Sequence, residues 1–319
     1  MDAVLFAKDL TRKPDTMRSL ANVLESSNPW TSLPSAERYV LVGMGSSKYA
    51  ASVAVARLQA AGINAIAELS STDLLPAVTP GTVVIAISAG GGSRETKAAV
   101  AHYLGNCPVV LLTNKPESEL AQSVDVVIDM HAEVEEGGVA SRSFQHTLAM
   151  LLALEVHLGA SSIDVPALVR ASADASQHLL ATWRGWLPEL TTHLVGPDGI
   201  HTVAPARRFS SAAQAALMLR EGPRTVAVAC ETGDWSHVDV YLTKTTDYRM
   251  LLFAGSRWED ELMTWVAERG STVVTVGGEV PGCVMSIRYP GDDNDDVALL
   301  TEVLVGELLA SDQWLRQQS

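Results

Sequence analysis

Short apolar runs alternate along the chain with longer segments in which apolar residues recur at helical spacing. In the first half the runs are Tyr39 to Val42, Asn64 to Glu68, Val83 to Ile87, Val109 to Thr113 and Val126 to Ile128. Runs of this length, bounded by glycine and polar residues, are typical of buried strands, and the segments between them are long enough for helices. The pattern predicts a doubly wound α/β sheet within the first 158 residues.

The second half of the chain repeats this alternation. Its predicted strands are His193 to Val195, Ile200 to Val203, Arg249 to Ala254, Thr272 to Val276 and Met285 to Tyr289. A second α/β domain is therefore expected. The predicted organisation is a helical arm at 1–37, a first domain at 38–160, a connector of two helices at 161–192 and a second domain at 193–319.

Two segments, Ile85 to Leu112 and Leu251 to Val276, resemble each other. Each reads as a strand, a Gly-Ser-Arg sequence, an acidic residue, an amphipathic helix and a strand with adjacent valines. The second copy lacks the glycine run and the threonine Thr96 of the first. We therefore expect the first copy to keep a ligand site and the second to serve as scaffold.

The loop from Ser88 to Thr96 has the composition of a phosphate site. It contains three consecutive glycines between an apolar strand and an alanine-rich helix. The glycines let the backbone approach an anion, and the first N–H groups of the helix and the Ser and Thr hydroxyls can donate hydrogen bonds to it. No Gly-Lys-Ser/Thr sequence follows, which argues against a nucleoside triphosphate. A strand-to-helix turn without a ligand is the competing interpretation.

A second loop of glycine and hydroxyl residues, Gly43 to Ser47, follows the first predicted strand. Ligands of doubly wound sheets lie beyond the carboxyl ends of the strands, so this loop and Ser88 to Thr96 are expected to face one pocket. A nucleotide-binding Rossmann enzyme is a weaker alternative. Glu68 is well placed as its acidic residue, but the loop lacks the third glycine of the fingerprint.

Composition and charge narrow the possible partners. The 319-residue chain is 47% hydrophobic but only 5% aromatic, as expected of sheets covered by helices. Its net charge is −14 without a Lys/Arg cluster, so nucleic acid and anionic membranes are disfavoured as partners. Cys107, Cys230 and Cys283 are widely spaced and form no metal-binding motif. The chain shows neither a signal sequence nor a long apolar segment, and a cytoplasmic protein is expected.

On these motifs the chain resembles the double sugar isomerase (SIS) domain family, in particular the isomerase half of glucosamine-6-phosphate synthase and stand-alone phosphosugar isomerases and deaminases. The resemblance covers nearly the whole chain and implies two SIS domains, each a mainly parallel, doubly wound sheet flanked by helices. It implies that Ser88, Ser93 and Thr96 bind the phosphate of the substrate. It also implies that Ser46 and Ser47, in place of the family's Cys-Gly-Thr-Ser loop, contact the sugar.

A third motif, Glu136-Gly137-Gly138-Val139-Ala140-Ser141, resembles the family's Glu-x-Gly-Val-Ala-Ser-Thr-Lys segment. The resemblance implies that the backbone of Val139 and the side chain of Ser141 approach the sugar. The lysine of the family motif is replaced by Ser143 in this chain.

Two motifs of the second half imply the catalytic residues. Ala216 to Glu221 resembles Ala-Leu-Lys-Leu-Lys-Glu, whose Glu is the isomerase base. Gly233 to His237 resembles Gly-Glu-x-x-His, whose His opens the sugar ring and comes from the partner subunit of a homodimer. The sixteen-residue spacing between Glu221 and His237 matches the family without a gap. A desolvated carboxylate can move a proton between carbons, and a histidine exchanges protons near neutral pH.

The resemblance implies an aldose-ketose isomerase or an amino-sugar-phosphate deaminase or deglycase. It is expected to bind a phosphorylated sugar or amino sugar as a homodimer, with neither metal nor organic cofactor. Glutaminase activity is not expected, because no glutaminase domain precedes residue 1. A catalytically idle phosphosugar-binding or regulatory protein is the alternative, because the family's lysine three residues before the base is Met218 and its C-terminal lysine tail is missing. The sequence does not choose among the three reactions.

Overall fold

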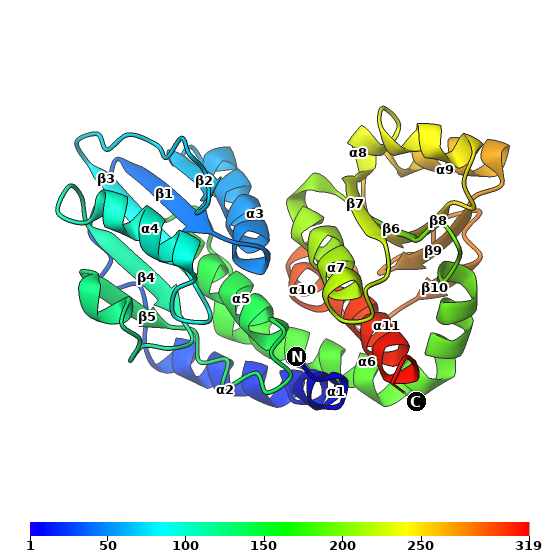
Figure 1. Ribbon diagram of the computed structural model, residues 1–319, viewed down its shortest axis with the longest axis horizontal. Coiled ribbons are helices and arrows are strands. Elements are labelled where there is room, and N and C mark those ends of the chain that lie inside the picture. Colours follow the sequence, from blue (N-terminus) through cyan, green and yellow to red (C-terminus); the bar gives the residue numbers. More distant parts are fainter. Residues whose placement is uncertain (319) are drawn as a thin grey trace. The chain divides into compact units, whose positions relative to one another are not determined.

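The computed structural model describes residues 1–318 and contains two five-stranded sheets (Figure 1). The chain divides into two compact units. The first-sheet unit comprises Thr16–Glu135 and Ala140–Arg170, and the second-sheet unit comprises Met1–Asp15, Glu136–Val139 and Ala171–Ser319. Ser319, the last residue of the predicted second domain, lies outside the described residues.

The first sheet has the strand order β2-β1-β3-β4-β5, and all its neighbouring strands are parallel. The strands are β1 (Arg38–Gly43), β2 (Ala65–Leu69), β3 (Thr82–Ile87), β4 (Val109–Thr113) and β5 (Val126–Asp129). The five strands predicted here and their parallel arrangement are confirmed. The central strand β3 is buried along its whole length, which explains its continuous apolar sequence.

Three helices cover the first sheet. They are α3 (Ser46–Ala60), α4 (Arg94–Tyr103) and α5 (Arg142–His157). The chain moves from β1 to β2 in one direction and from β3 to β4 in the other, so right-handed crossovers place α3 and α4 on opposite faces. Helix α5 packs beside α3 (Figure 1). The direction of winding therefore reverses between β1 and β3.

The second sheet is also parallel throughout, with the order β10-β9-β8-β6-β7. Its strands are β6 (Ile200–Ala204), β7 (Ala227–Glu231), β8 (Arg249–Phe253), β9 (Thr272–Val276) and β10 (Met285–Ile287). Its helices are α7 (Phe209–Glu221), α8 (Thr232–Trp235), α9 (Glu259–Arg269), α10 (Asp295–Thr301) and α11 (Val303–Arg316). Read from its β7 edge, the second sheet places its second, first, third, fourth and fifth strands in that order, as the first sheet does. Its winding reverses between β6 and β8.

One strand prediction in the second half is wrong, and one strand was not predicted. His193 and Leu194 form the end of α6 (Val165–Leu194), a single 30-residue helix, rather than a strand. A run of three apolar residues is too short to show whether its periodicity is that of a helix or that of a strand. The strand that completes the sheet is β7, an edge strand on which Val228 is exposed, as is Val226 before it.

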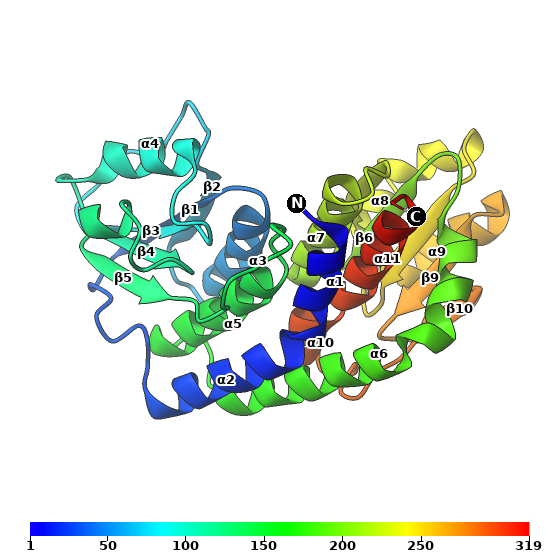
Figure 2. The ribbon, with the colours of Figure 1, turned by 60° about the horizontal axis from the view of Figure 1, so that its bottom comes forward.

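The N-terminal arm consists of α1 (Ala3–Thr11) and α2 (Lys13–Ser26). Helix α1 lies beside α11, as Figure 2 shows, and the rings of Phe6 and Trp314 are 5.9 Å apart. Lys13 and Glu307, whose side chains are completely buried, form an ion pair in this interface. The start of the chain is therefore part of the core of the second-sheet unit.

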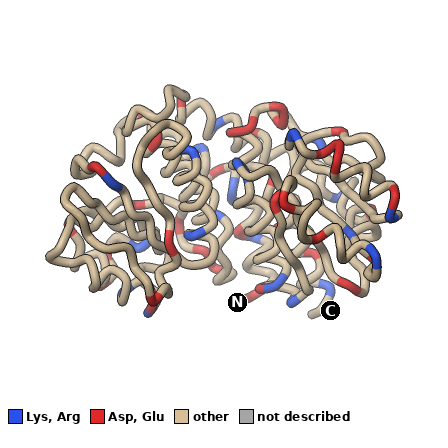
Figure 3. Tube along the Cα trace, turned by 90° about the horizontal axis from the view of Figure 1, so that it is seen from above, with Lys and Arg blue, Asp and Glu red and all other residues tan. Residues whose placement is uncertain are grey.

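Residues 1–318 include no helix that is both long enough and apolar enough to cross a bilayer. In the view of Figure 3, the Lys and Arg residues are scattered among Asp and Glu residues rather than gathered in one patch.

A buried ionic cluster lies between α7, α10 and α11 in the second-sheet unit. The guanidinium group of Arg208 contacts the carboxylate of Glu302, which is completely buried, and its Nε donates to Asp295 at 3.1 Å. Burial raises the pKa of Glu302 to about 7, although Arg208 acts in the opposite direction. The folded protein therefore binds a proton at Glu302 more tightly than the unfolded chain does.

We expect this carboxyl group to make stability depend on pH. A folded-state pKa above the unfolded value stabilises the protein fully below pH 4.5, and the effect is lost as the pH rises through about 7. The loss is up to roughly 3 kcal/mol, at about 1.4 kcal/mol per unit of pKa. Urea unfolding of the wild type and of Glu302→Gln at pH 5 and pH 8 checks this, because the variant should lack this part of the decrease. Equal decreases in the two proteins would contradict it.

Candidate functional site

Two loops meet at the carboxyl edge of the first sheet. β1 ends at Gly43 and β3 at Ile87, and these residues are register partners in adjacent strands. The loops that follow, with Ser46 and Ser47 in one and Ser88 in the other, leave the sheet at the point where its winding reverses. This is the position at which doubly wound sheets bind ligands.

The loop after β3 holds its hydroxyl groups in place by hydrogen bonds. Ser88 is buried, and its Oγ accepts from the backbone N–H of Gly92 at 2.8 Å. Ser93 caps α4 by accepting from the N–H of Thr96 at 3.2 Å, and the two hydroxyls are also 3.2 Å apart. The structure thus brings Ser93 and Thr96 together at the start of α4, with Ser88 at the start of the same loop.

The glycine turn in this loop leaves no room for a side chain. Gly91 has a φ of +78°, and a Cβ there would lie 2.7 Å from the Cβ of Ser118. Both the backbone conformation and the close approach require glycine. Glycine is therefore needed at this position for the turn to pack against Ser118.

Ser70 is a hydroxyl group of this edge that we did not single out from the sequence. It follows β2, is buried, and its Oγ accepts from the hydroxyl of Thr96 at 3.5 Å. The signal was present as the run Ser70-Ser71-Thr72 directly after a strand. Three successive strands of the sheet, β2, β1 and β3, thus end in hydroxyl residues.

The charged residues at this edge differ in sign. The carboxylate of Glu95 accepts hydrogen bonds from its own N–H and from the Ser93 hydroxyl, which hold its pKa below the usual range. Lys48, in the first turn of α3, is half-buried, and burial lowers its pKa while Glu68 opposes the shift. Lys48 adds a cation beside Ser46 and Ser47, and sequence reasoning gave it no role.

The start of α5 is fixed by Glu135. One of its carboxylate oxygens accepts from the N–H groups of Ser141 and Arg142 at 2.6 and 2.7 Å. The other oxygen accepts from the hydroxyl of Ser143 at 2.6 Å, so the residue that replaces the family's lysine holds Glu135 in place. Ser141 is completely buried, and its Oγ has no partner among residues 1–318.

Val139 belongs to the second-sheet unit, where α1 fixes its segment. The N–H of Gly137 donates to the carboxylate of Asp9 at 2.7 Å, and its carbonyl accepts from the N–H of Asp2 at 3.1 Å. A Cβ on Gly137 would lie 2.6 Å from the backbone of Phe6. The glycine of this motif is therefore needed for contact with α1.

Glu221 and His237 lie at opposite edges of the second sheet. Helix α7 leads from the carboxyl edge after β6 back to the amino edge before β7, and Glu221 is its last residue. His237 is exposed and follows α8, beyond the carboxyl end of β7. β7 has five residues, which corresponds to about 17 Å. Within this unit the two residues do not form one site.

Glu221 is half-buried, and burial raises the pKa of its carboxyl group, with Arg220 opposing the shift. Its position at the end of a helix favours the neutral form further, because the C-terminal end of the helix dipole repels negative charge. The group can therefore accept and release a proton closer to neutral pH than an exposed glutamate.

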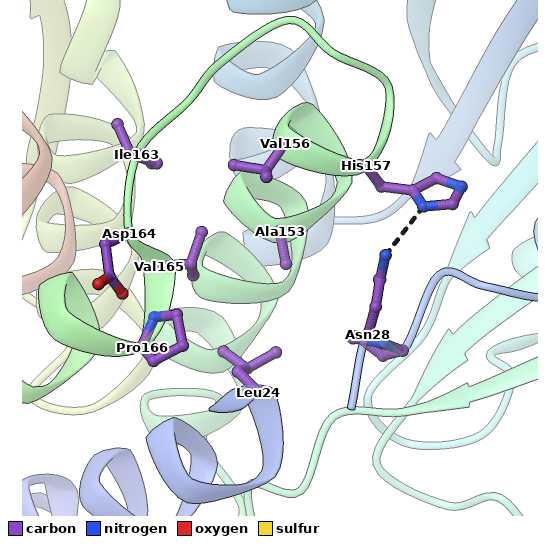
Figure 4. A pocket seen from close by; sticks show the side chains of 10 residues that line it. Leu24, Asn28, Ala153, Val156, His157, Ile163, Asp164, Val165 and Pro166 are labelled. Carbon is purple, nitrogen blue, oxygen red and sulfur yellow. Dashed lines mark hydrogen bonds between the residues drawn. The ribbon is translucent and has the colours of Figure 1, made fainter. Parts of the chain in front are cut away.

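An apolar cavity of about 200 Å³ lies elsewhere in the first-sheet unit, between the end of α2, the end of α5 and the start of α6 (Figure 4). Asn28 and His157 face each other across its rim, with the Asn28 Nδ2 3.0 Å from the His157 Nδ1. This cavity is at the opposite end of α5 from Ser141, about 24 Å along the helix. It is separate from the hydroxyl loops.

Comparison with known proteins gives one family match. Residues 32–157 match the family model of the SIS domain. This segment contains the whole first sheet, both hydroxyl loops and α5. Among curated proteins, the chain is similar to the glutamine–fructose-6-phosphate aminotransferase (isomerizing) of Zymomonas mobilis, with 24% identity over 297 residues. The match covers 89% of this chain and 48% of the relative, so the chain spans about half its length.

Solved structures share the fold over nearly the whole chain. Tagatose-6-phosphate ketose/aldose isomerase from Escherichia coli has a TM-score of 0.80 at 15% identity, covering 98% of this chain and 93% of that one. Glucosamine-6-phosphate deaminase from Thermotoga maritima has a TM-score of 0.76 at 18% identity, and the match covers 98% of this chain and 95% of that one. Residues 32–157 thus match the SIS family, and the chain as a whole has the fold of these two proteins.

Proposed function

We propose that the carboxyl edge of the first sheet binds the phosphate of a phosphorylated sugar or amino sugar, and that the second sheet is a second SIS domain. The observation that carries the proposal is the set of hydroxyl groups of Ser88, Ser93 and Thr96, which hydrogen bonds hold in place around the turn at Gly91. A phosphate bound there by hydroxyl and N–H donors fixes the rest of the sugar, so that its binding energy orients the reacting carbons.

We propose that the reaction is a proton shift between C1 and C2 of the open-chain sugar, with Glu221 as the base. In isomerisation, Glu221 removes a proton from one carbon and returns it to the other. In a 2-amino sugar phosphate the same shift yields an imine at C2, which water hydrolyses to a ketose with release of ammonia. The raised pKa of Glu221 supports this role, because a base whose pKa is closer to the operating pH takes and returns a proton more readily. The reaction uses side chains alone, without a metal or organic cofactor.

His237 is proposed to open the sugar ring in the active site of a partner subunit. Glu221 and His237 lie at opposite edges of one sheet, which supports a site that combines residues of two copies of the chain. Several apolar residues are exposed close to His237 in the sequence, on the edge strand β7 and directly before that strand. These are Val226, Val228, Val238, Tyr241 and Leu242. Such residues support a homodimer that buries this face.

The alternative function is a catalytically idle phosphosugar-binding or regulatory protein. One observation favours it. Met218, which stands at the position of the lysine in the motif that Ala216 to Glu221 resembles, is 1% exposed and packs in the core of the second-sheet unit. The chain therefore has no cation at that position to stabilise the charge that develops on the sugar oxygens.

A thermal-shift screen tests the phosphate site. Sugar phosphates and amino-sugar phosphates are expected to raise the melting temperature of the wild type, whereas their unphosphorylated counterparts are not. Thr96→Val removes one hydroxyl at constant volume and should weaken binding about tenfold, as expected for a lost hydrogen bond to a charged group. Thr264→Val, on the exposed face of α9, is the matched control and should bind as the wild type does.

Ammonia and ketose assays on each stabilising compound then separate deaminase from isomerase. A protein that no phosphorylated sugar stabilises would contradict the proposed site. A protein that binds such a compound without turnover would favour the idle binding protein.

A further inference from the structure

An open cleft of about 410 Å³ lies at the carboxyl edge of the second sheet. It is lined by the loops that follow β6 and β8 and by Glu231 at the end of β7. The winding of this sheet reverses between β6 and β8, so the cleft occupies the position at which doubly wound sheets bind ligands. Its volume is within the usual range of about 300–1,000 Å³ for small-molecule sites. The function proposed above makes no use of it.

The chain's own carboxylates already occupy the backbone donors of this cleft. Glu231 accepts from the N–H groups of Ala206, Gly233 and Asp234 at 3.1, 2.7 and 2.9 Å. Glu259 accepts from the N–H groups of Gly255 and Ser256. A ligand in the cleft therefore has to bind through side chains rather than through backbone N–H groups.

The side chains left for a ligand are hydrogen-bond donors. Arg257 lies over the ring of Trp258, with its Cζ 4.7 Å from the ring centroid, and no carboxylate among residues 1–318 pairs with it. Arg207 uses Nε and Nη2 to bind Asp295 and the carbonyl of Gly255, which leaves its Nη1 able to donate to a ligand. An unpaired guanidinium group has a high affinity for oxyanions, because it presents several charged N–H donors in one plane.

The carboxylates near the cleft do not cancel this preference. Asp295 is held by Arg207 and Arg208, and the oxygens of Glu231 and Glu259 receive the backbone bonds described above. Trp258 is 45% exposed and offers an apolar ring edge beside the guanidinium group.

We propose that this cleft is a second binding site, for a small organic oxyanion whose oxygens accept hydrogen bonds from Arg257 and Arg207 and whose carbon skeleton packs on Trp258. A phosphate monoester and a carboxylate share this chemistry. The site is independent of the hydroxyl loops of the first sheet, because every residue that lines it belongs to the second-sheet unit.

The test follows the indole N–H signal of Trp258 by NMR of the protein with 15N-labelled tryptophan, after assignment with Trp258→Phe. Inorganic phosphate, glucose 6-phosphate and gluconate are titrated separately to about 10 mM. A saturable shift with at least one organic probe is expected. If only glucose 6-phosphate shifts the signal, the ligand class is a phosphate ester. If only gluconate shifts it, the ligand class is a carboxylate. A shift with both compounds supports the shared chemistry.

Arg257→Gln should weaken this response about tenfold or more, because it removes the positive charge and the planar set of guanidinium N–H donors. The matched control is Arg184→Gln, since Arg184 also lies over a tryptophan ring, 5.0 Å from the centroid of Trp183, but on α6. Thr96→Val should leave the Trp258 response unchanged and so separates this site from the first-sheet loops. No saturable shift with an organic probe, or equal weakening by the two arginine variants, would overturn the proposal.

Discussion

Glu221→Gln is expected to lower turnover of the sugar phosphate by about 10²- to 10⁴-fold, the usual contribution of a general base. Affinity should stay within about threefold of the wild type, because the amide keeps the shape and the phosphate contacts lie in the other unit. Burial raises the pKa of Glu221 above the usual 4.5. As the pH falls, the wild type should therefore lose activity with a midpoint above pH 4.5, because the base becomes protonated. Steady-state kinetics over a pH series, together with a binding titration, measure both effects.

The matched control is Glu261→Gln, an exposed glutamate in the first turn of α9, which should leave turnover unchanged. If Glu221→Gln and Glu261→Gln retain equal activity in an active enzyme, Glu221 is not the base. An equal loss of affinity and turnover would instead assign Glu221 to substrate binding.

Mixing Glu221→Gln chains with His237→Ala chains tests the shared active site. If each site takes its base from one subunit and its histidine from the other, the heterodimer contains one intact site. The purified heterodimer should then have about half of the wild-type activity, although each variant alone is inactive. An inactive heterodimer would exclude the proposed exchange of His237 between subunits.

Lys13→Met is expected to lower the free energy of unfolding by about 3–5 kcal/mol, the largest stability effect that we predict. The ammonium group of Lys13 and the carboxylate of Glu307 are both completely buried, so the substitution removes the cation of a buried ion pair and keeps its carboxylate. Since α1 packs on α11, the loss acts on the core of the second-sheet unit. Urea unfolding monitored by tryptophan fluorescence measures it.

Lys97→Met is the control for this variant. Lys97 and Glu119 also form an ion pair, but their side chains are 45% and 84% exposed, and such pairs contribute about 0–1 kcal/mol. A similar decrease in the free energy of unfolding for both variants would show that burial of the ion pair does not determine the size of the effect. Lys13→Met combined with Glu307→Gln should recover part of the stability, because the uncompensated charge is then removed.

The inner strands of the first sheet, β1, β3 and β4, could be predicted because they are buried on both faces. β3 is apolar at every position, and the glycine and hydroxyl loops that end β1 and β3 mark their carboxyl ends. β7 was missed because an edge strand is covered on one side only and carries a polar end at Glu231. The same short apolar pattern at His193 belongs to a helix end, where the 3.6-residue period cannot be recognised.

The composition of the candidate site was easier to predict than its geometry. Hydroxyl residues after strands indicated Ser88 and Thr96, but the contact between Thr96 and Ser70 depends on strand order, which the sequence does not contain. The motif suggested Glu136, whereas Glu135 accepts the bonds at the start of α5. A one-residue difference of this kind depends on the turn conformation between β5 and α5.

The exposed edge strand β7 has a consequence for the solution behaviour of the chain. Its unpaired backbone groups, flanked by the exposed Val226 and Val228, can form hydrogen bonds with the same edge of another molecule. The net charge of −14 opposes this contact by repulsion, and salt reduces that repulsion because the Debye length falls from about 30 Å at 0.01 M to about 3 Å at 1 M. We therefore expect higher ionic strength to favour the association of two copies of the chain through β7.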